Sequence, residues 1–287
     1  MPAQDTFENK IPILDNHIHL DPRGQMEENI KRFAKAGGTH VVIVNKPYRE
    51  GELLETKSYQ KTFDLTLSMA DKCRESCPEV GVYVVLGPYP VDLLRLTEKM
   101  SISDAKKVMC EGMELAKKYV VEGAAIAIGE IGRPHFQVEH DIIKCSNEIL
   151  TFGMECAKDA GCPVVLHTES ASEAVWRELA EMADSVKLPR EKVIKHFAPP
   201  AVQETENFGL FPSILASKHS VKEAVARSDR FMMETDFLDD PARPGAVLGI
   251  TTVPKVTKML LQNELADEDK LIRIHKDNAE KLYGIEM

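Results

Sequence analysis

Short apolar runs alternate with longer amphipathic stretches along this chain. The apolar runs are rich in Val and Ile and lack a polar face, which is typical of parallel strands buried on both sides. The amphipathic stretches predict the helices that connect these strands. Strands are predicted at residues 11–14, 39–44, 81–86, 123–128, 163–166, 192–195, 212–216 and 231–234. Helices are predicted at residues 25–36, 56–77, 103–121, 138–160, 172–186, 221–227, 253–262 and 267–283.

About eight strand–helix units in a chain of this length predict a TIM (β/α)8 barrel. The competing fold is an open doubly wound sheet, which usually carries a Gly-x-Gly-x-x-Gly turn after its first strand. Here the first apolar run is followed by Asp15-Asn16-His17-Ile18-His19 instead. No linker, repeat or low-complexity segment interrupts the pattern, so residues 1–287 are expected to form a single domain.

Composition narrows the class of protein further. Hydrophobic residues make up 43% and charged residues 29% of the 287 residues, as in globular proteins. The formal charge of −10 argues against a broad basic surface for nucleic acid, while a small-molecule or short nucleic-acid substrate remains compatible with it. We expect no signal peptide and no membrane span, and therefore a cytoplasmic location. The six scattered cysteines are interpreted as reduced thiols, and the oligomeric state stays open, a homo-oligomer included.

Candidate metal ligands occupy the ends of five predicted strands. His17 and His19 are two residues apart, so on a strand their side chains point the same way. In a barrel the carboxyl ends of all strands converge on one face, where such enzymes carry out their chemistry. Six imidazoles and carboxylates would meet there, which suits two ions sharing a bridging carboxylate. The six residues are His17, His19, Glu130, His167, His196 and Asp236.

Five segments resemble motifs of the TatD family of metal-dependent hydrolases, within the amidohydrolase superfamily, and they come in the family's order. The segments are Asp15-Asn16-His17-Ile18-His19, Gly129-Glu130-Ile131-Gly132, Pro163-Val164-Val165-Leu166-His167, Lys195-His196-Phe197 and Glu234-Thr235-Asp236. The resemblance implies that one metal is held by His17, His19 and Asp236, the other by His167 and His196, with Glu130 as the bridge. Zinc is the expected cofactor for both positions, with Mn, Mg, Fe or Ni as alternatives.

The predicted chemistry follows from such a centre. Two divalent ions lower the pKa of bound water toward about 7 and stabilise charge on the oxygen of the substrate. Asp236 is the expected general base, and Glu130 is the second expected catalytic residue. Asp15 is expected on the same face as His17, as a partner that orients an imidazole.

The predicted substrate side of the site departs from the family pattern. Nucleases of the family usually carry His-Ser-Arg after strand 5, whereas this chain has His167-Thr168-Glu169. An acidic side chain there would repel a phosphodiester. Arg133 and Thr168 are the predicted substrate-binding residues, and Lys46 and Lys218 are further candidates for a phosphate-binding cation. Two histidines in the loop after strand 4, His135 and His140, are near enough to be extra site residues but are interpreted as loop and helix-start residues.

Three functions remain open at this point. The first is a phosphoesterase or nuclease of the TatD type, in which activated water attacks a phosphoester or phosphodiester. The second is a hydrolase of a small carboxylic ester, lactone or amide on the same binuclear site, which the Thr168-Glu169 sequence favours. The third is a barrel retained for binding without catalysis, and the complete set of predicted ligands counts against it.

Overall fold

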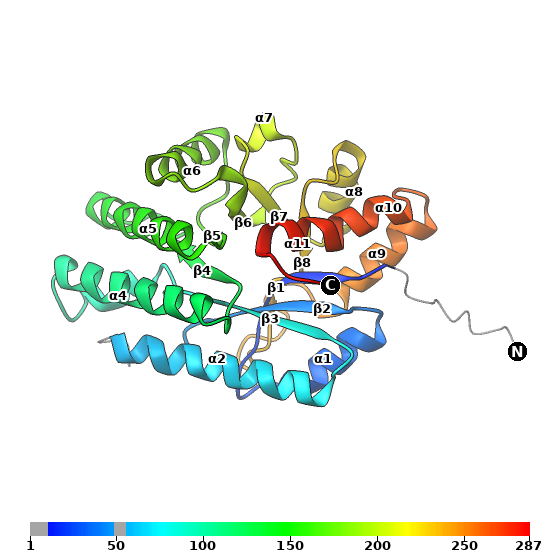
Figure 1. Cartoon of the computed structure of the whole chain (residues 1–287), viewed down its shortest axis with the longest axis horizontal. Coiled ribbons are helices and arrows are strands. Elements are labelled where there is room, and N and C mark those ends of the chain that lie inside the picture. Colours follow the sequence, from blue (N-terminus) through cyan, green and yellow to red (C-terminus); the bar gives the residue numbers. More distant parts are fainter. Residues whose placement is uncertain (1–10, 49–55) are drawn as a thin grey trace, which may run out of the picture.

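Strands and helices alternate around a ring in the computed structural model, which describes residues 11–48 and 56–287 (Figure 1). The strands are β1 (Leu14–His19), β2 (His40–Val44), β3 (Gly81–Leu86), β4 (Ala127–Gly132), β5 (Val164–His167), β6 (Val193–Ala198), β7 (Phe211–Leu215), β8 (Met232–Glu234) and β9 (Phe237–Leu238). Each strand pairs in parallel with its neighbours, in the order β8-β7-β6-β5-β4-β3-β2-β1-β9. This connectivity is produced by helical crossovers between successive strands.

The ring is closed by a strand that is interrupted once. β8 pairs with β7, β9 pairs with β1, and only Thr235 and Asp236 separate the two segments. β8 and β9 therefore act together as the eighth strand of a barrel. The predicted TIM (β/α)8 fold is confirmed, and the interruption lies at a predicted metal ligand.

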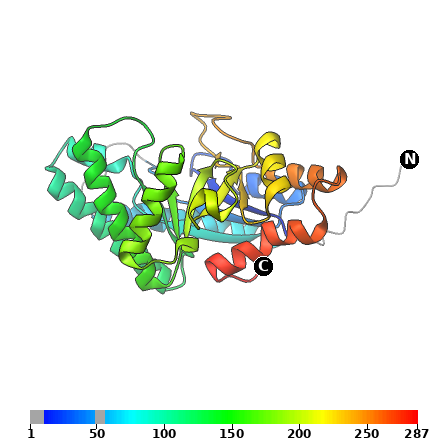
Figure 2. The same ribbon diagram turned by 90° about the horizontal axis from the view of Figure 1, so that it is seen from above.

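Helices surround the strands and place the loops at their carboxyl ends. They are α1 (Met26–Lys35), α2 (Thr56–Ser76), α3 (Asp92–Thr97), α4 (Ile102–Val121), α5 (His140–Ala160), α6 (Glu173–Val186), α7 (Glu204–Asn207), α8 (Lys218–Arg227), α9 (Thr252–Gln262), α10 (Glu268–Ile272) and α11 (Asn278–Tyr283). Figure 2 shows α4 to α6, in green, and α9 to α11, in orange and red, on opposite sides of the strands. No helix in the described ranges is both long and apolar enough to cross a membrane.

The inside of the barrel is filled by apolar side chains from successive strands. Leu14, Val42, Val165 and Ile194 belong to one buried cluster, which also contains Leu282 from α11. A packed interior of this kind leaves polar chemistry to the carboxyl ends of the strands. Helix α11 covers the cluster from the other end, and Figure 1 shows it lying across the ring.

Four predicted strands end too early when compared with the structure. β1, β4, β5 and β6 include polar residues that were expected to follow an apolar run, namely Asp15 to His19, Glu130, His167 and His196. Polarity was read as the end of each strand, although polar side chains extend a strand when the mouth of the barrel provides partners for them. The short helices α3 and α7 were not predicted.

Two helix predictions also need correction. The helix expected to open at Ser103 begins at Ile102, because Ser101 caps it by accepting a hydrogen bond from the amide of Asp104. The helix expected over 267–283 is α10 and α11 joined by a π-helical turn over Arg273–Asp277. Such single turns are the usual form of π-helix inside longer helices.

Candidate metal centre

His17 and His19 project together from β1 into the barrel mouth. Their Nε2 atoms lie 3.2 Å apart, and both residues are buried. Nδ1 of His19 donates a hydrogen bond to the carbonyl oxygen of Val44 at 2.9 Å. In the neutral ring this contact leaves Nε2 of His19 unprotonated, with its lone pair directed into the mouth.

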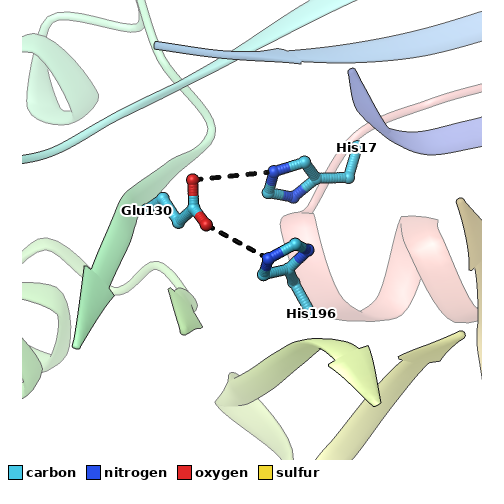
Figure 3. Close-up of side chains that lie close together, drawn as sticks. All are labelled: His17, Glu130 and His196. Carbon is cyan, nitrogen blue, oxygen red and sulfur yellow. Dashed lines mark ion pairs between the residues drawn. The ribbon is translucent and has the colours of Figure 1, made fainter. Parts of the chain in front are cut away.

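Glu130, on β4, lies between two pairs of imidazoles. Its Oε2 is 3.9 Å from Nε2 of His17 and 3.7 Å from Nε2 of His19. Its Oε1 is 3.1 Å from Nε2 of His196 and makes a close contact with Nδ1 of His167. Figure 3 shows the carboxylate reaching toward His17 with one oxygen and toward His196 with the other. The two oxygens thus face different histidine pairs, as the predicted bridge requires.

The two glycines around Glu130 allow β4 and β5 to approach closely. A Cβ on Gly132 would lie 2.0 Å from the carbonyl oxygen of His167, and Gly132 has a φ of +144°. A Cβ on Gly129 would lie 2.8 Å from the carbonyl oxygen of Val165. Only glycine fits both positions, so the Gly-Glu-Ile-Gly segment brings Glu130 and His167 into contact.

Asp236 lies between the end of β8 and the start of β9. Its φ of +49° lies in the left-handed region, which is uncommon for residues other than glycine. Its Oδ1 is 3.4 Å from Nε2 of His19 and 4.0 Å from Nε2 of His17. The backbone just before it is held by Asp15, which accepts hydrogen bonds from the amide and the hydroxyl of Thr235 at 2.9 and 2.6 Å.

The prediction that Asp15 orients an imidazole was therefore wrong. Its carboxylate accepts from the backbone amide of His17 at 3.4 Å and contacts Thr235, so it positions main chain and not an imidazole ring. The carboxylate that orients an imidazole is Glu234, whose Oε1 is 3.0 Å from Nδ1 of His196 and accepts from the amide of Phe197 at 2.7 Å. Glu234 was part of the Glu-Thr-Asp motif, but its position two residues before Asp236 did not reveal its partner.

Glu130 and His17 are held in protonation states that suit a bound cation. Burial alone would raise the pKa of Glu130, but the facing His167 and His196 outweigh burial and hold this pKa well below its ordinary value. Burial and the neighbouring rings of His196 and His19 hold the pKa of His17 well below its ordinary value. A carboxylate kept ionised and an imidazole kept neutral both present lone pairs, which is the state in which they bind metals.

The distances between the potential ligand atoms also fit a bound metal ion. In each of two groups, His17 with Glu130 and His196 and His17 with His19 and Asp236, the ligand atoms lie within 4.8 Å of one another. Two nitrogens that bind one zinc ion at about 2.1 Å lie roughly 3.0–3.4 Å apart, and the two Nε2 atoms of β1 are 3.2 Å apart. Nδ1 of His17 is buried without a hydrogen-bond partner among the described residues, so no protein group competes for this nitrogen.

Two residues outside the six predicted ligands lie against His167. Nδ1 of His135 is 2.7 Å from Nε2 of His167, so this exposed histidine contacts the centre instead of serving only as a loop residue. The ring of Tyr89, after β3, packs edge-on against the ring of His167 with centroids 5.3 Å apart. His140 is the first residue of α5 and is exposed, which confirms its interpretation as a helix-start residue.

The predicted substrate cations are placed differently from expectation. The side chain of Arg133 is 3% exposed, and its nitrogens donate to Glu169, Asn147 and Glu178 at 2.8–2.9 Å. Lys46 donates to Asp21 at 2.7 Å with a side chain that is 12% exposed. Both cations are therefore already neutralised by carboxylates. Lys218 is exposed at the start of α8.

Thr168 has a buried side chain. Its hydroxyl donates to the carbonyl oxygen of Glu169 at 3.2 Å. This contact uses its only donor, and the oxygen keeps lone pairs for a further partner. Thr168 directly follows His167 in the sequence, so its backbone lies next to that proposed ligand.

A barrel whose strand ends gather imidazoles and carboxylates in this way belongs to the class of metal-dependent hydrolases. A sequence model of the family described as TatD related DNase matches residues 14–284. The uncharacterized protein MJ1127 of Methanocaldococcus jannaschii is 40% identical over 280 residues, which cover 96% of this chain and 97% of that protein. The chain belongs to the TatD related DNase family.

Solved structures agree on the fold. YjjV of Escherichia coli, a TatD homologue, superimposes with a TM-score of 0.66 at 21% identity, over 95% of this chain and 98% of that one. A 5-methylcytosine deaminase from Klebsiella pneumoniae gives a TM-score of 0.54 at 15% identity, over 94% of this chain and 74% of that one. At these sequence identities the superpositions show that the barrel fold is shared.

Proposed function

We propose that this chain is a divalent-metal-dependent phosphoesterase whose centre holds two cations. The observation that carries the proposal is the position of Glu130, with Oε2 facing His17 and His19 and Oε1 facing His167 and His196. A carboxylate between two imidazole pairs can divide its oxygens between two ions. The ligands of one cation would be His17, His19 and Asp236, and those of the other His167 and His196, with Glu130 between them.

The donor set favours zinc. Imidazole nitrogens together with carboxylate oxygens suit Zn, and Mn, Mg, Fe or Ni are the alternatives. When bound, such cations lower the pKa of water and stabilise the charge that develops on the phosphoryl oxygens. The buried position of the ligands keeps this charge in a medium of low dielectric constant, where electrostatic stabilisation is stronger.

Residues of the chain itself transfer the proton and position the proposed ligands. The carboxylate of Asp236 accepts a proton from the attacking water, whose oxygen forms a bond to phosphorus. The bond from phosphorus to the leaving alcohol then breaks, and Asp236 returns the proton to the alcohol oxygen. Glu234 keeps the ring of His196 in place through its 3.0 Å contact with Nδ1. Asp15 holds Thr235, and through it the backbone that carries Asp236.

A second candidate is a hydrolase of small carboxylic esters, lactones or amides. The observation in its favour is the contact of Arg133 with Glu169 and Glu178, whose carboxylates already balance the charge that a phosphodiester would need. The same metal centre would serve, because a polarised carbonyl and a polarised phosphoryl group make similar demands. A small-molecule or short nucleic-acid substrate is proposed for the phosphoesterase, and a small-molecule substrate for the second candidate.

A comparison of model substrates tests the proposal. Metal-replete protein is assayed with bis(4-nitrophenyl) phosphate, with 4-nitrophenyl acetate and with a panel of lactones. We expect hydrolysis of the phosphodiester, loss of that activity after chelation, and one to two equivalents of a divalent metal by elemental analysis. Hydrolysis of lactones or esters alone would replace the first candidate by the second. Protein that binds no divalent metal would contradict both.

A further inference from the structure

A cavity of about 210 Å³ lies beside the proposed metal centre. Its walls come from the carboxyl ends of β2 and β3 and from helices α2 and α3, and include Asn45, Tyr59, Lys61, Asp92 and Arg95. The metal ligands do not line this cavity. In Figure 1 the long helix α2 crosses below β2 and β3, and it supplies one wall.

Tyr89 connects the cavity with the centre. Its side chain lines the cavity, and its ring packs edge-on against His167 at a centroid distance of 5.3 Å. Burial raises the pKa of the Tyr89 hydroxyl, and the negative charges of Glu130, Asp92 and Asp236 raise it further. One side chain thus borders both places, so a molecule in the cavity lies next to the centre.

Asp92 is a buried carboxylic acid with unused hydrogen-bonding capacity. The residue is 2% exposed, and its Oδ2 accepts from the hydroxyl of Tyr59 at 3.4 Å. Its Oδ1 has no hydrogen-bond partner among residues 11–48 and 56–287, since Arg95 is 3.7 Å away. Buried polar atoms are nearly always paired. An unpaired carboxylate oxygen at a cavity therefore points to a ligand with an O–H or N–H donor.

The described residues that line the cavity carry more positive than negative charge. Lys61 is exposed, and the side chain of Arg95 is 35% exposed, with an ion pair to Asp92 too long for a hydrogen bond. These two cations differ from Arg133 and Lys46, which are bonded to carboxylates at 2.8 and 2.7 Å. With one acid and two cations among the described residues of its walls, the cavity suits a ligand with a negative charge.

Aromatic side chains complete the lining. Tyr48, Tyr59 and Tyr89 border the cavity. Asn45 is fixed at its edge by two hydrogen bonds with Gly87, to the carbonyl oxygen at 2.9 Å and from the amide at 2.7 Å. Rigid aromatic walls favour the flat face of a ring over a flexible chain. The volume has room for one such ring and not for a folded polymer.

We propose that this cavity binds the leaving-group side of the substrate, as a ring that bears O–H or N–H donors together with a negative charge. Asp92 accepts from the donors, the tyrosines pack against the ring, and Arg95 and Lys61 attract the charge. The assignment of the bound ring as the leaving group rests on the proposed hydrolase function. The binding of such a ring in the cavity does not depend on that function. Sugar phosphates and nucleoside monophosphates share this chemistry.

Direct binding distinguishes these sources. Isothermal titration calorimetry of the full-length protein uses ribose 5-phosphate, adenosine 5′-monophosphate and inorganic phosphate as probes. We expect at least one of the two ring-bearing probes to bind more tightly than phosphate. Equal binding of both assigns the cavity to a sugar phosphate, and binding of the nucleotide alone assigns it to a heterocycle. Binding of neither above the level of phosphate overturns the proposal.

Variants locate the binding. We expect Asp92→Asn and Arg95→Gln each to weaken binding of the ring-bearing probe by about tenfold, the loss typical of one hydrogen bond to a charged group. Lys72→Met, which removes an exposed cation from α2 outside the cavity, should leave binding unchanged. Arg95→Gln lies at a partly exposed position and keeps the result interpretable if Asp92→Asn does not fold. Unchanged binding in folded variants overturns the proposal.

The outcome separates this proposal from the proposed function. If ring-bearing probes bind but no ester substrate is turned over, the proposed ligand site is supported and the proposed hydrolase function is rejected. Turnover of bis(4-nitrophenyl) phosphate without ring-dependent binding retains the hydrolase and rejects the cavity. If both are correct, Arg95→Gln raises KM for a ring-bearing phosphoester by about tenfold and leaves kcat nearly unchanged, because Arg95 contacts no ligand of the centre.

Discussion

Tyr283, in the last helix, donates a hydrogen bond at 2.9 Å to Oδ1 of Asn16, in the first strand. Asn16 in turn donates to the hydroxyl of Ser213 at 3.0 Å, and this hydroxyl donates to Glu234. Glu234 completes the chain of contacts at Nδ1 of His196. A buried polar network therefore runs from α11 through the barrel to a proposed metal ligand, and partners of this kind set the orientation of metal-binding imidazoles.

The first prediction concerns this network. Glu234→Gln keeps the size of the side chain but removes the charge that faces His196. We expect metal affinity to fall about 10- to 100-fold, the effect usual for such partners, in a competition titration with a chromogenic chelator. Tyr283→Phe is the matched control, since it removes a distant hydroxyl and should cost about 1 kcal/mol of stability with metal affinity preserved. Equal metal affinity in Glu234→Gln and wild type would contradict the proposed role.

The second prediction concerns the shared ligand. His17 belongs to both groups of potential metal ligands, so His17→Ala removes an atom from each. We expect phosphodiesterase activity to fall by at least about 10³-fold, while the circular dichroism spectrum stays unchanged. Asp236→Asn should have a similar effect on activity, because the amide cannot accept the proton of the water. His140→Ala, at an exposed helix start, is the control and should retain full activity.

The third prediction concerns metal removal. The buried cluster brings His17, His19, His196, Glu130 and Asp236 within a few ångströms, and a cation that binds only the folded state stabilises it by mass action. At a free metal concentration of about 100 times the dissociation constant, the gain is roughly 2.7 kcal/mol. We expect a chelator to lower the melting temperature by several degrees and added zinc to restore it. A melting temperature that ignores both reagents would argue against a metal centre.

The fourth prediction concerns Arg133. Removing its guanidinium leaves Glu169 and Glu178 without their partner, so Arg133→Met should lower stability by about 1–3 kcal/mol. Part of the usual cost is lost to solvent screening, because both carboxylates are partly exposed. We expect KM for bis(4-nitrophenyl) phosphate to change less than about twofold in the folded variant. A large rise in KM with an unchanged melting temperature would instead support the original hypothesis that Arg133 binds phosphate.

The fifth prediction concerns pH. His275 is buried, its Nδ1 accepts from the amide of Leu14 at 3.2 Å, and its Nε2 contacts the hydroxyl of Thr257 at 2.8 Å. Burial lowers the pKa of His275 from 6.5 to about 4. Between these values the unfolded chain binds the proton and the folded protein does not, so this contribution to stability is lost as pH falls from 6.5 toward 4.

The size of the effect follows from the shift, which corresponds to on the order of 3 kcal/mol. Denaturant unfolding at pH 7.5, 6 and 5 measures it, in wild type and in His275→Gln. The variant is expected to be less stable at neutral pH and to lose less stability on acidification, since glutamine does not titrate. Parallel pH profiles of the two proteins would rule out this contribution from His275.

Much of the site was readable from local sequence. His17 and His19 lie two apart on a strand, so their shared direction follows from backbone geometry alone. Glu130, His167 and His196 each follow an apolar run, and a parallel barrel places such positions on one face. The structure brings Glu130 into contact with His167 and His196, as this reasoning predicted.

Other features depended on partners far away in sequence. Asp15 and Glu234 are both buried acids in predicted motifs, yet only the fold shows that Asp15 contacts Thr235 and that Glu234 contacts His196. The contacts of Arg133 with Glu169 and Glu178 cross between elements in the same way. The helix α3 was missed because it has six residues, follows two prolines and carries no side-chain cap.

By itself, then, the sequence determined the barrel, the strands that carry candidate ligands and the residue types available to a cation, because apolar spacing and strand direction are local properties of a chain. Only the tertiary structure decided which carboxylate faces which imidazole, which cations are already neutralised, and that Tyr89 joins a cavity to the centre. Buried contacts in this barrel join residues up to 267 positions apart, as between Asn16 and Tyr283. Side chains so distant meet only after the ring has closed and burial has made each unpaired polar atom costly.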